Sequence, residues 1–267
     1  MESKDVRAYW EDRAASDTSP QSTTLDYYLR DIEFRVLADQ IEKQSPSRVF
    51  DIGCGDGYTT LRLAGRFPDV AFVGGDYAHP MIENARANVE KSKVKNVDLL
   101  HFDVLSPPDV GQFDFAYTTR CIINVIGWDK QKAAFTNIHG MLRPKGVYCM
   151  IENFADGQSA LNEVRKSFGL DEIKIRPHNC FLEKENVYSF LGAAFDIIQD
   201  ENISSSYYLV SRVIYSKICQ IEGVQPDYFD KHHELASKLP FCGNYGPVRM
   251  MLLSKKKDAR LDLECFT

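Results

Sequence analysis

The feature that most constrains this chain is the stretch Val49–Gly57, which reads VFDIGCGDG. The short run Arg48–Ile52 predicts a buried strand. The alternate glycines that follow permit a tight turn in which a ligand can approach the bare backbone. From Thr59, a candidate N-cap, apolar residues at positions 61, 63 and 64 indicate a helix. A strand, a glycine turn and a helix N-terminus together predict a nucleotide-binding cradle in an α/β sheet.

The order of residues in this turn distinguishes between two kinds of ligand. A dinucleotide fingerprint needs a third glycine at position 58, where this chain has Tyr58. The pattern is instead D-x-G-x-G-x-G, with a carboxylate two residues before the first glycine. It resembles motif I of the class I S-adenosylmethionine-dependent methyltransferases. The resemblance implies that the methionine part of S-adenosylmethionine packs against Asp51, Gly53, Cys54 and Gly55.

The composition limits the classes of partner. The chain has 267 residues, 44% hydrophobic and 26% charged, which predicts one globular domain with insertions. A net charge of −6, with one basic run at Lys255–Lys257, argues against DNA or RNA as substrate. No apolar run approaches the roughly 18 residues of a membrane span, and no signal peptide is apparent. Seven scattered cysteines without a C-x-x-C pair predict neither disulfides nor a metal site. We therefore expect a cytoplasmic protein without nucleic-acid, membrane or metal partners, and leave a homodimer open.

The end of the second predicted strand, 71–76, carries the next cofactor candidates. Asp76 lies about 20 residues past the glycine turn, where a carboxylate can bind both ribose hydroxyls. A cap for the following helix is the alternative role. Tyr77 would border the adenine pocket, and Met81 would pack against the adenine face or belong to the ordinary core.

The third and fourth predicted strands, 97–102 and 113–117, end in further polar residues. The resemblance implies that Asp103 bonds the adenine amino group and that the backbone N–H of Val104 bonds a ring nitrogen. An exposed loop aspartate is the alternative for Asp103. Ligands bind at the carboxyl edge of open α/β sheets, which favours the segment 118–124 as part of the site. Within it we expect Thr119 beside the cofactor.

The N-terminal residues 1–45 form a predicted helical lid ahead of the methyltransferase core, 46–267. Apolar residues repeat at helical spacing from Leu25, and Pro46 ends the run. In the resembled family such helices often close over cofactor and substrate. The lid candidates are Tyr9, Trp10, Tyr27 and Arg30, with simple helix packing as the alternative.

The C-terminal half predicts the rest of a regular core plus two insertions. A helix capped by Asp129 carries a surface histidine, His139, and ends at the turn 143–146 before strand 147–151. A helix at 183–193 and strands at 195–199 and 248–253 follow. The resemblance implies a Rossmann-like, doubly wound, seven-stranded and mostly parallel sheet with an antiparallel last strand. With the sixth strand parallel to its neighbours, insertions at about 154–180 and 201–246 both leave the carboxyl edge and form a substrate lid.

The chemistry of methyl transfer asks for a positioned acceptor and a base. The reaction is an in-line displacement, for which orientation alone supplies roughly 7–11 kcal/mol. Histidine is the usual base for a hydroxyl acceptor. His178 is the candidate because it lies in an insertion beside a proline, although lid histidines also bind substrate or simply pack. Tyr28, Glu152 and His233 are weaker alternatives.

The insertions are rich in polar and aromatic residues typical of a substrate pocket. We expect substrate contacts from Tyr28, Arg120, Asn124, Asn179, Tyr207, Tyr208 and Arg212. The pair Tyr207–Tyr208 can equally be one core and one surface aromatic. Arg120, Arg212 and Arg249 would converge on a carboxylate or phosphate, with structural salt bridges as the alternative. The sequence therefore predicts a polar or anionic small-molecule substrate, methylated on oxygen or nitrogen.

Two other functions fit the same fold. One is a non-methyl transfer of the aminopropyl type, because a fold does not determine its chemistry. The other is a non-catalytic S-adenosylmethionine-binding protein, which the intact Asp51, Asp76 and Asp103 disfavour. An NAD-dependent enzyme is disfavoured by Tyr58.

Overall fold

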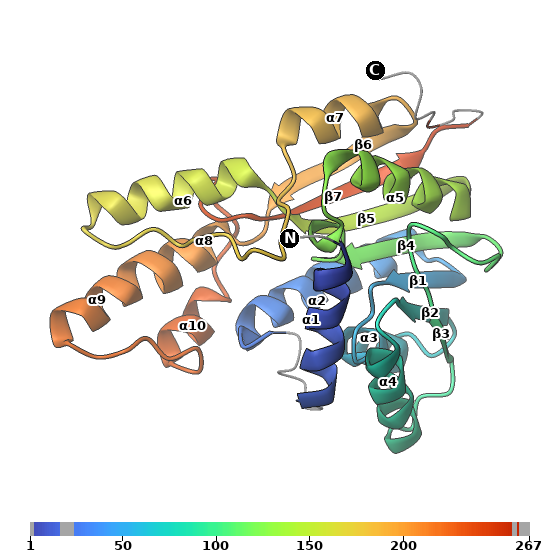
Figure 1. Ribbon diagram of the computed structural model, residues 1–267, viewed down its shortest axis with the longest axis horizontal. Coiled ribbons are helices and arrows are strands. Elements are labelled where there is room, and N and C mark those ends of the chain that lie inside the picture. Colours follow the sequence, from blue (N-terminus) through green and yellow to red (C-terminus); the bar gives the residue numbers. More distant parts are fainter. Residues whose placement is uncertain (1–2, 17–23, 258–260, 262–267) are drawn as a thin grey trace.

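The computed structural model describes residues 3–16, 24–257 and 261 (Figure 1). Its centre is a seven-stranded sheet. The strands are β1 Arg48–Ile52, β2 Ala71–Asp76, β3 Val97–His101, β4 Phe113–Thr119, β5 Leu142–Asn153, β6 Phe195–Asn202 and β7 Val248–Lys255. The order across the sheet is β3-β2-β1-β4-β5-β7-β6, with β7 antiparallel to both of its neighbours and the other pairs parallel. The predicted fold class is confirmed.

Helices cover both faces of this sheet. Their bounds are α1 Ser3–Ser16, α2 Tyr27–Gln44, α3 Tyr58–Arg66, α4 His79–Lys91, α5 Trp128–Met141, α6 Ala155–Ser167, α7 Lys184–Gly192, α8 Ser205–Tyr208, α9 Tyr215–Glu222 and α10 Lys231–Ala236. A 3₁₀ turn spans Ile122–Asn124, and a π-helical turn spans Leu209–Ile214. In sequence order α1 and α2 precede β1, and α8 to α10 lie between β6 and β7.

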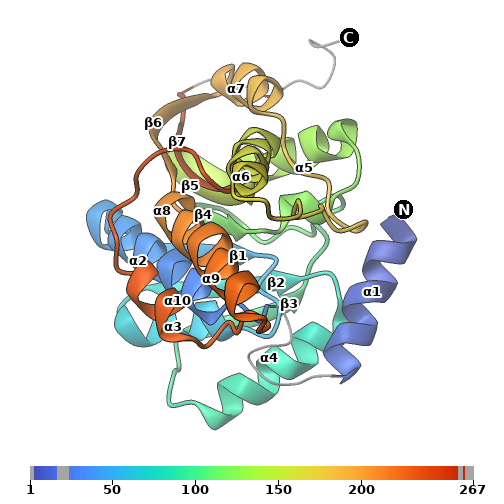
Figure 2. The ribbon, with the colours of Figure 1, turned by 90° about the vertical axis from the view of Figure 1, so that its left-hand side faces the viewer.

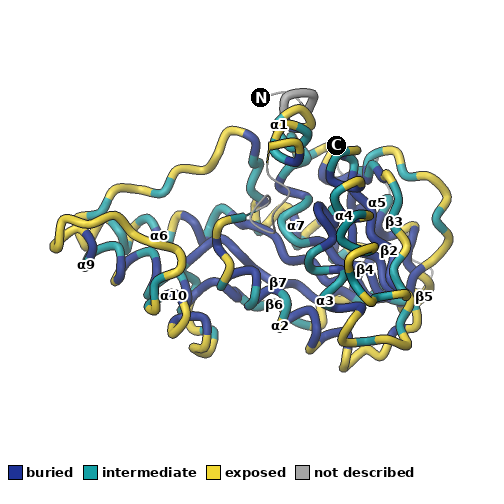
Figure 3. The backbone as a smooth tube through the Cα atoms, turned by 90° about the horizontal axis from the view of Figure 1, so that it is seen from below, coloured by how far each residue is buried: buried dark blue, intermediate teal, exposed yellow. Residues whose placement is uncertain are grey.

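Alternate strand residues enter two separate hydrophobic cores, as expected for a sheet buried on both faces. Tyr148 and Met150 of β5 pack with Phe135 of α5 and Phe190 of α7. The residues between them pack with α2 and α3 on the opposite face. Buried residues therefore concentrate along the strands (Figure 3). This rigid centre determines where the strand ends, and hence the polar residues after them, are placed.

Two predicted helix caps are wrong. Gly57, with φ +75°, occupies the N-cap of α3, so Thr59 lies inside the helix. Gly127 occupies the N-cap of α5, and Asp129 lies in its first turn. In both places a glycine with a positive φ makes the sharp change of direction that the chain needs. An acidic residue in the first turn still favours the helix through its dipole.

Two further details differ from the sequence prediction. The turn at 143–146 lies within β5 as an irregularity, because Phe113 pairs with Leu142 and Phe115 pairs with Val147. His139 is buried rather than exposed, and its ring contacts Phe195 edge-on. Burial lowers the pKa of His139 to about 4, so this side chain belongs to the core as a neutral imidazole.

The two insertions extend from the same edge of the sheet. β6 runs in the same direction as β5, because β7 lies between them and is antiparallel to both. The prediction that the sixth strand is parallel to its hydrogen-bonded neighbour is therefore wrong. Both β5 and β6 therefore end at the carboxyl edge. The first insertion holds α6 and an irregular segment, 168–181, that we call the strap; the second holds α8 to α10. The helices of both lie side by side beyond the sheet (Figures 1 and 2).

Candidate functional site

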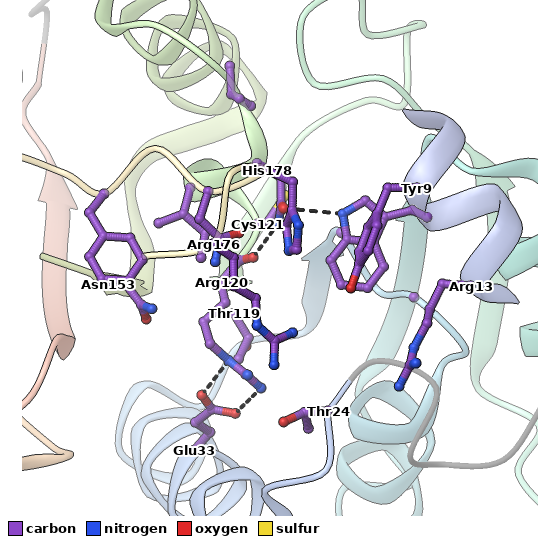
Figure 4. A pocket seen from close by; sticks show the side chains of 18 of the residues that line it. Tyr9, Arg13, Thr24, Glu33, Thr119, Arg120, Cys121, Asn153, Arg176 and His178 are labelled. Carbon is purple, nitrogen blue, oxygen red and sulfur yellow. Dashed lines mark hydrogen bonds and ion pairs between the residues drawn. The ribbon is translucent and has the colours of Figure 1, made fainter. Parts of the chain in front are cut away.

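A cavity of about 650 Å³ lies at the carboxyl edge of the sheet (Figure 4). Its volume is within the usual range for small-molecule sites, about 300–1,000 Å³. Its walls come from α1, α2, the glycine turn, the ends of β2, β4 and β5, the strap, and the π-helical turn. The cavity is lined by all of the predicted cofactor residues, Asp51, Gly53, Cys54, Gly55, Asp76, Tyr77, Met81, Asp103, Val104 and Thr119. Their contact with a cofactor stays a prediction.

The glycine turn is held by the end of β2. The N–H groups of Gly53 and Cys54 both donate to the carbonyl of Gly75, at 2.8 and 3.0 Å. The carboxylate of Asp76 accepts the N–H of Gly55 through one oxygen and the N–H of Ala78 through the other, each at 2.9 Å. Each carboxylate oxygen has two lone pairs, so Asp76 can still accept hydroxyl hydrogens from a ligand. The helix-cap role and the ribose role are therefore compatible.

Asp51 ties β1 to α3. Its carboxylate accepts the hydroxyl of Thr60 at 2.5 Å, and it is buried at the cavity wall. Burial raises the pKa of Asp51 to about 6. The same loop is braced from α2, where Arg30 pairs with Asp56 at 3.2 Å and lies over the ring of Tyr58 at 4.1 Å.

Three polar side-chain atoms at the cavity wall are buried without a hydrogen-bond partner among the described residues. They are the hydroxyl oxygens of Tyr77 and Thr119 and the amide oxygen of Asn153. Leaving a buried polar atom unpaired costs roughly 1–3 kcal/mol. These three atoms around one cavity are available to hydrogen-bond a polar ligand.

The loop after β4 is held in an unusual conformation. Arg120 has φ +53°, a left-handed value that is uncommon outside glycine. Its guanidinium pairs with the buried carboxylate of Glu33, at 2.9 Å and 3.0 Å. The carboxylate of Glu152 accepts the N–H groups of the three residues that follow Arg120, which are residues 121–123, at 3.0, 3.0 and 3.3 Å. Burial raises the pKa of Glu152 to about 7. Because Glu152 does not line the cavity, its alternative role as the base is not supported.

The helix α1 covers the cavity from the N-terminal side. The indole N–H of Trp10 donates to the amide oxygen of Asn124 at 3.1 Å. Tyr9 stacks on His178 with ring centroids 4.0 Å apart. Ala14 packs with Met81 at the foot of the same helix, and α1 lies against α4 (Figure 2). Figure 4 shows Tyr9 and Arg13 across the cavity from Arg120. Of the predicted lid residues, Tyr27 does not line the cavity.

His178 lies in the strap and lines the cavity. The residue is 7% exposed. Burial, the larger cause, and the nearby Arg176 cation, the smaller one, lower the pKa of His178 below the usual 6.5. The ring is therefore a neutral imidazole at neutral pH, which is the protonation state that a general base requires. Asn179, next in the strap, also lines the cavity.

The predicted substrate residues divide into two groups. Arg120, Asn124, Tyr208 and Arg212 line the cavity, whereas Tyr28 and Tyr207 do not, so for these two tyrosines the predicted position is wrong. The Tyr207 hydroxyl is buried behind the wall. It donates to Asp26 and bonds the ring of His233 at 2.8 Å. His233 is likewise outside the cavity and is not placed as a base.

The three arginines do not converge on one point. Arg212 pairs with Asp26 and lies over the rings of Tyr208 and Tyr228, at 4.9 and 4.7 Å. Arg249 pairs with Asp200 at 2.5 Å and does not line the cavity. Each of the three arginines forms an ion pair with a carboxylate of the protein, which is the alternative role given above.

Several wall residues were absent from the sequence prediction. They are Asp26, Glu33, Asn153 and Lys174. The pattern I-K-I-R at 173–176 was a usable signal, because it alternates apolar and basic residues in a polar insertion. Asp26 was also findable as the N-cap of α2, whose Leu29 N–H it accepts at 3.1 Å. Glu33 carries no local signal, because its partner is distant in sequence.

Within the described residues, no group of three or more His, Cys, Asp or Glu side chains is arranged to hold a metal ion. In the same part of the chain, every helix is too short or too polar to cross a membrane. The absence of nucleic-acid partners, the cytoplasmic location and a homodimer stay predictions.

Comparison with known families identifies the central part of this fold. Residues 49–146 match the family model described as a methyltransferase domain. This region is therefore similar to a methyltransferase domain, and the order of the sheet agrees with the fold that the glycine turn predicts. The match starts at β1 and the glycine turn and runs into β5. It covers all of the predicted cofactor residues, whose part of the cavity wall we call the cofactor side, and neither insertion.

Similar proteins cover more of the chain at low identity. An O-methyltransferase of Aspergillus nomiae is 26% identical over 60% of this chain and 67% of its own length. A malonyl-[acyl-carrier protein] O-methyltransferase of Geobacter sulfurreducens is 28% identical over 58% of this chain and 55% of its own. Among solved structures, magnesium protoporphyrin IX methyltransferase from Synechocystis with bound S-adenosylhomocysteine has a TM-score of 0.61. It is 12% identical and covers 96% of this chain and 100% of its own. At that identity the structural likeness shows the fold alone.

Proposed function

We propose that this protein transfers a methyl group from S-adenosylmethionine to an oxygen or nitrogen of a small molecule. One observation carries the proposal: a single cavity brings the glycine turn and the carboxylates of Asp76 and Asp103 together with the neutral imidazole of His178. The two curated relatives, named as O-methyltransferases, support the reaction class. No structural observation favours an aminopropyl transfer.

The cavity wall fits the cofactor at its polar end. Asp76 has free lone pairs for ribose hydroxyls, and the hydroxyls of Tyr77 and Thr119 lack partners among the described residues. Met81 offers an apolar side chain on the same wall. Several buried carboxylates at this end favour a cationic ligand such as a sulfonium. The residues present therefore suit S-adenosylmethionine.

The side chains of this protein would position the acceptor and remove its proton. When bound, S-adenosylmethionine supplies a methyl group activated by the sulfonium charge. His178 would accept the proton of an acceptor hydroxyl, because its ring is neutral and stacked in place on Tyr9. Trp10, bonded to Asn124, would help α1 exclude water from the cavity.

Calorimetric titration tests this proposal. We expect the protein to bind S-adenosylmethionine at micromolar concentration and NAD far more weakly. Asp76→Asn should weaken binding at least about tenfold, because the amide loses the charge and half of the acceptor capacity. Asp98→Asn, on the exposed part of β3, is the matched control and should bind normally. NAD binding in place of S-adenosylmethionine would contradict the proposal.

A further inference from the structure

The strap is held in place by side chains of α6. The amide of Asn162 bonds both backbone groups of Ile173, accepting its N–H at 3.0 Å and donating to its carbonyl at 3.2 Å. Gln158 donates to the same carbonyl at 3.0 Å, and Arg165 donates to the carbonyl of Asp171 at 2.8 Å. An irregular segment with its backbone bonded in this way has a defined course. Its side chains are therefore presented to the cavity in a set arrangement.

The strap presents apolar and cationic side chains alternately. Ile173, Lys174, Ile175 and Arg176 all line the cavity. Lys174 and Arg176 are exposed, and neither forms an ion pair with a carboxylate among the described residues. Arg176 lines the same cavity as His178, two positions farther along the strap (Figure 4).

The other cations on the substrate side of the cavity are already occupied. Arg120 is paired with Glu33, and Arg212 is paired with Asp26. Each of these pairs satisfies a buried carboxylate, so recruiting either arginine for a ligand would leave that carboxylate uncompensated. Lys174 and Arg176 can bind an anion without breaking an existing ion pair.

The cavity also has apolar and aromatic side chains in its wall. Leu25, Tyr208 and Tyr228 line the cavity together with the two strap isoleucines. Tyr228 also stacks with the Arg212 guanidinium, which orients its ring. A ligand that fits this end therefore has an apolar body and an anionic group. A cationic amine would meet two uncompensated positive charges there.

We propose that the methyl acceptor is a small apolar acid whose anionic group binds Lys174 and Arg176. This inference rests on the proposed function and names the substrate class of the same cavity. The body of the acid packs between Ile175 and Tyr228. The atom to be methylated lies farther in, toward His178. A guanidinium and an ammonium each suit a carboxylate or a phosphate.

Calorimetry with matched acids and amides tests the substrate class. The probes are decanoate, 4-hydroxybenzoate and 4-hydroxyphenylacetate, each beside its primary amide, titrated into protein saturated with S-adenosylhomocysteine. We expect at least one acid to bind at least tenfold more tightly than its amide. The double variant Lys174→Met/Arg176→Met should lose that preference. The control Lys166→Met/Lys95→Met removes two exposed charges outside the main cavity and should keep it.

The outcomes distinguish a failure of this inference from a failure of the proposed function. Amides that bind as tightly as acids, a double variant that keeps the preference, or no acid bound at millimolar concentration would overturn the inference. Saturation with S-adenosylhomocysteine is itself measured first, in the wild type and in both variants. If that ligand fails to bind, the proposed function falls and the inference falls with it. If it binds and the acid preference is absent, only the inference fails.

Discussion

The two sides of the cavity are held in place by different kinds of contact. On the cofactor side, the glycine turn is bonded mainly by backbone groups and by Asp76, only 21 positions away from Gly55. On the substrate side, side chains from distant segments bond one another, as in the pair between Arg212 and Asp26, 186 positions apart. The cofactor side therefore follows from a short stretch of sequence. The substrate side depends on how the whole chain folds, which leaves it free to differ between relatives.

The comparison also separates the two sides by charge. Carboxylates predominate near the turn, where Asp51 and Asp76 are buried in the wall. On the strap, the two charged side chains that line the cavity are both cations, Lys174 and Arg176. A cationic cofactor and an anionic acceptor would each meet the opposite charge at its own end, which would orient both ligands before reaction.

The largest effect is expected from Gly53→Ala, which disrupts the cofactor side. The added Cβ would lie 2.5 Å from the sulfur of Cys121, in a residue with φ +81°. Overpacking and backbone strain together should lower the free energy of unfolding by about 3 kcal/mol. Gly140→Ala is the control, because its Cβ meets nothing within 4 Å and a helical alanine should stabilise by about 0.5–1 kcal/mol. Urea unfolding measures the free energy of unfolding of both variants. Equal values for Gly53→Ala and Gly140→Ala would show that the glycine turn is not tightly packed.

A smaller effect is expected from Tyr207→Phe, which disrupts the substrate side. Loss of the hydroxyl leaves His233 without its bond at 2.8 Å and removes one donor from Asp26. The free energy of unfolding should fall by about 1–2 kcal/mol, while S-adenosylmethionine affinity stays within twofold. Tyr188→Phe, a half-buried tyrosine on α7, is the control and should change stability by less than about 0.5 kcal/mol. A large loss of cofactor affinity in Tyr207→Phe would mean that the two sides are coupled.

The smallest effect concerns the charge on the strap. NMR titration should give His178 a pKa below 6.5, because burial and the Arg176 cation both disfavour the imidazolium. Arg176→Met should raise that pKa, because it removes the nearby cation. Arg143→Met, remote from the cavity, should leave it unchanged. Since the folded state lowers this pKa, the contribution of His178 to stability is complete above pH 6.5 and is lost as the pH falls through the folded value. A normal pKa would contradict a buried, cation-flanked ring.

The elements near the glycine turn were predictable because their signals are local. β1 and β2 follow from apolar runs and glycines, all read within a few residues. The helix caps failed because the glycines Gly57 and Gly127 provide the needed backbone conformation without a capping side chain. His139 was misplaced because a single histidine on a helix carries no signal of which helix face it occupies.

By itself, the sequence determined the strand, the glycine turn and the helix of the cradle, since each depends on neighbours in the chain. The predicted cofactor residues line one cavity, and their contact with a cofactor stays a prediction. Only the tertiary structure decided which cations and tyrosines line the cavity. Arg120 and Arg212 are paired with carboxylates of α2 and its N-cap, 87 and 186 positions away. Tyr207 faces the core and Tyr208 faces the cavity. The pairing of charges depends on distances in space, and distances between remote segments are set only when the chain has folded.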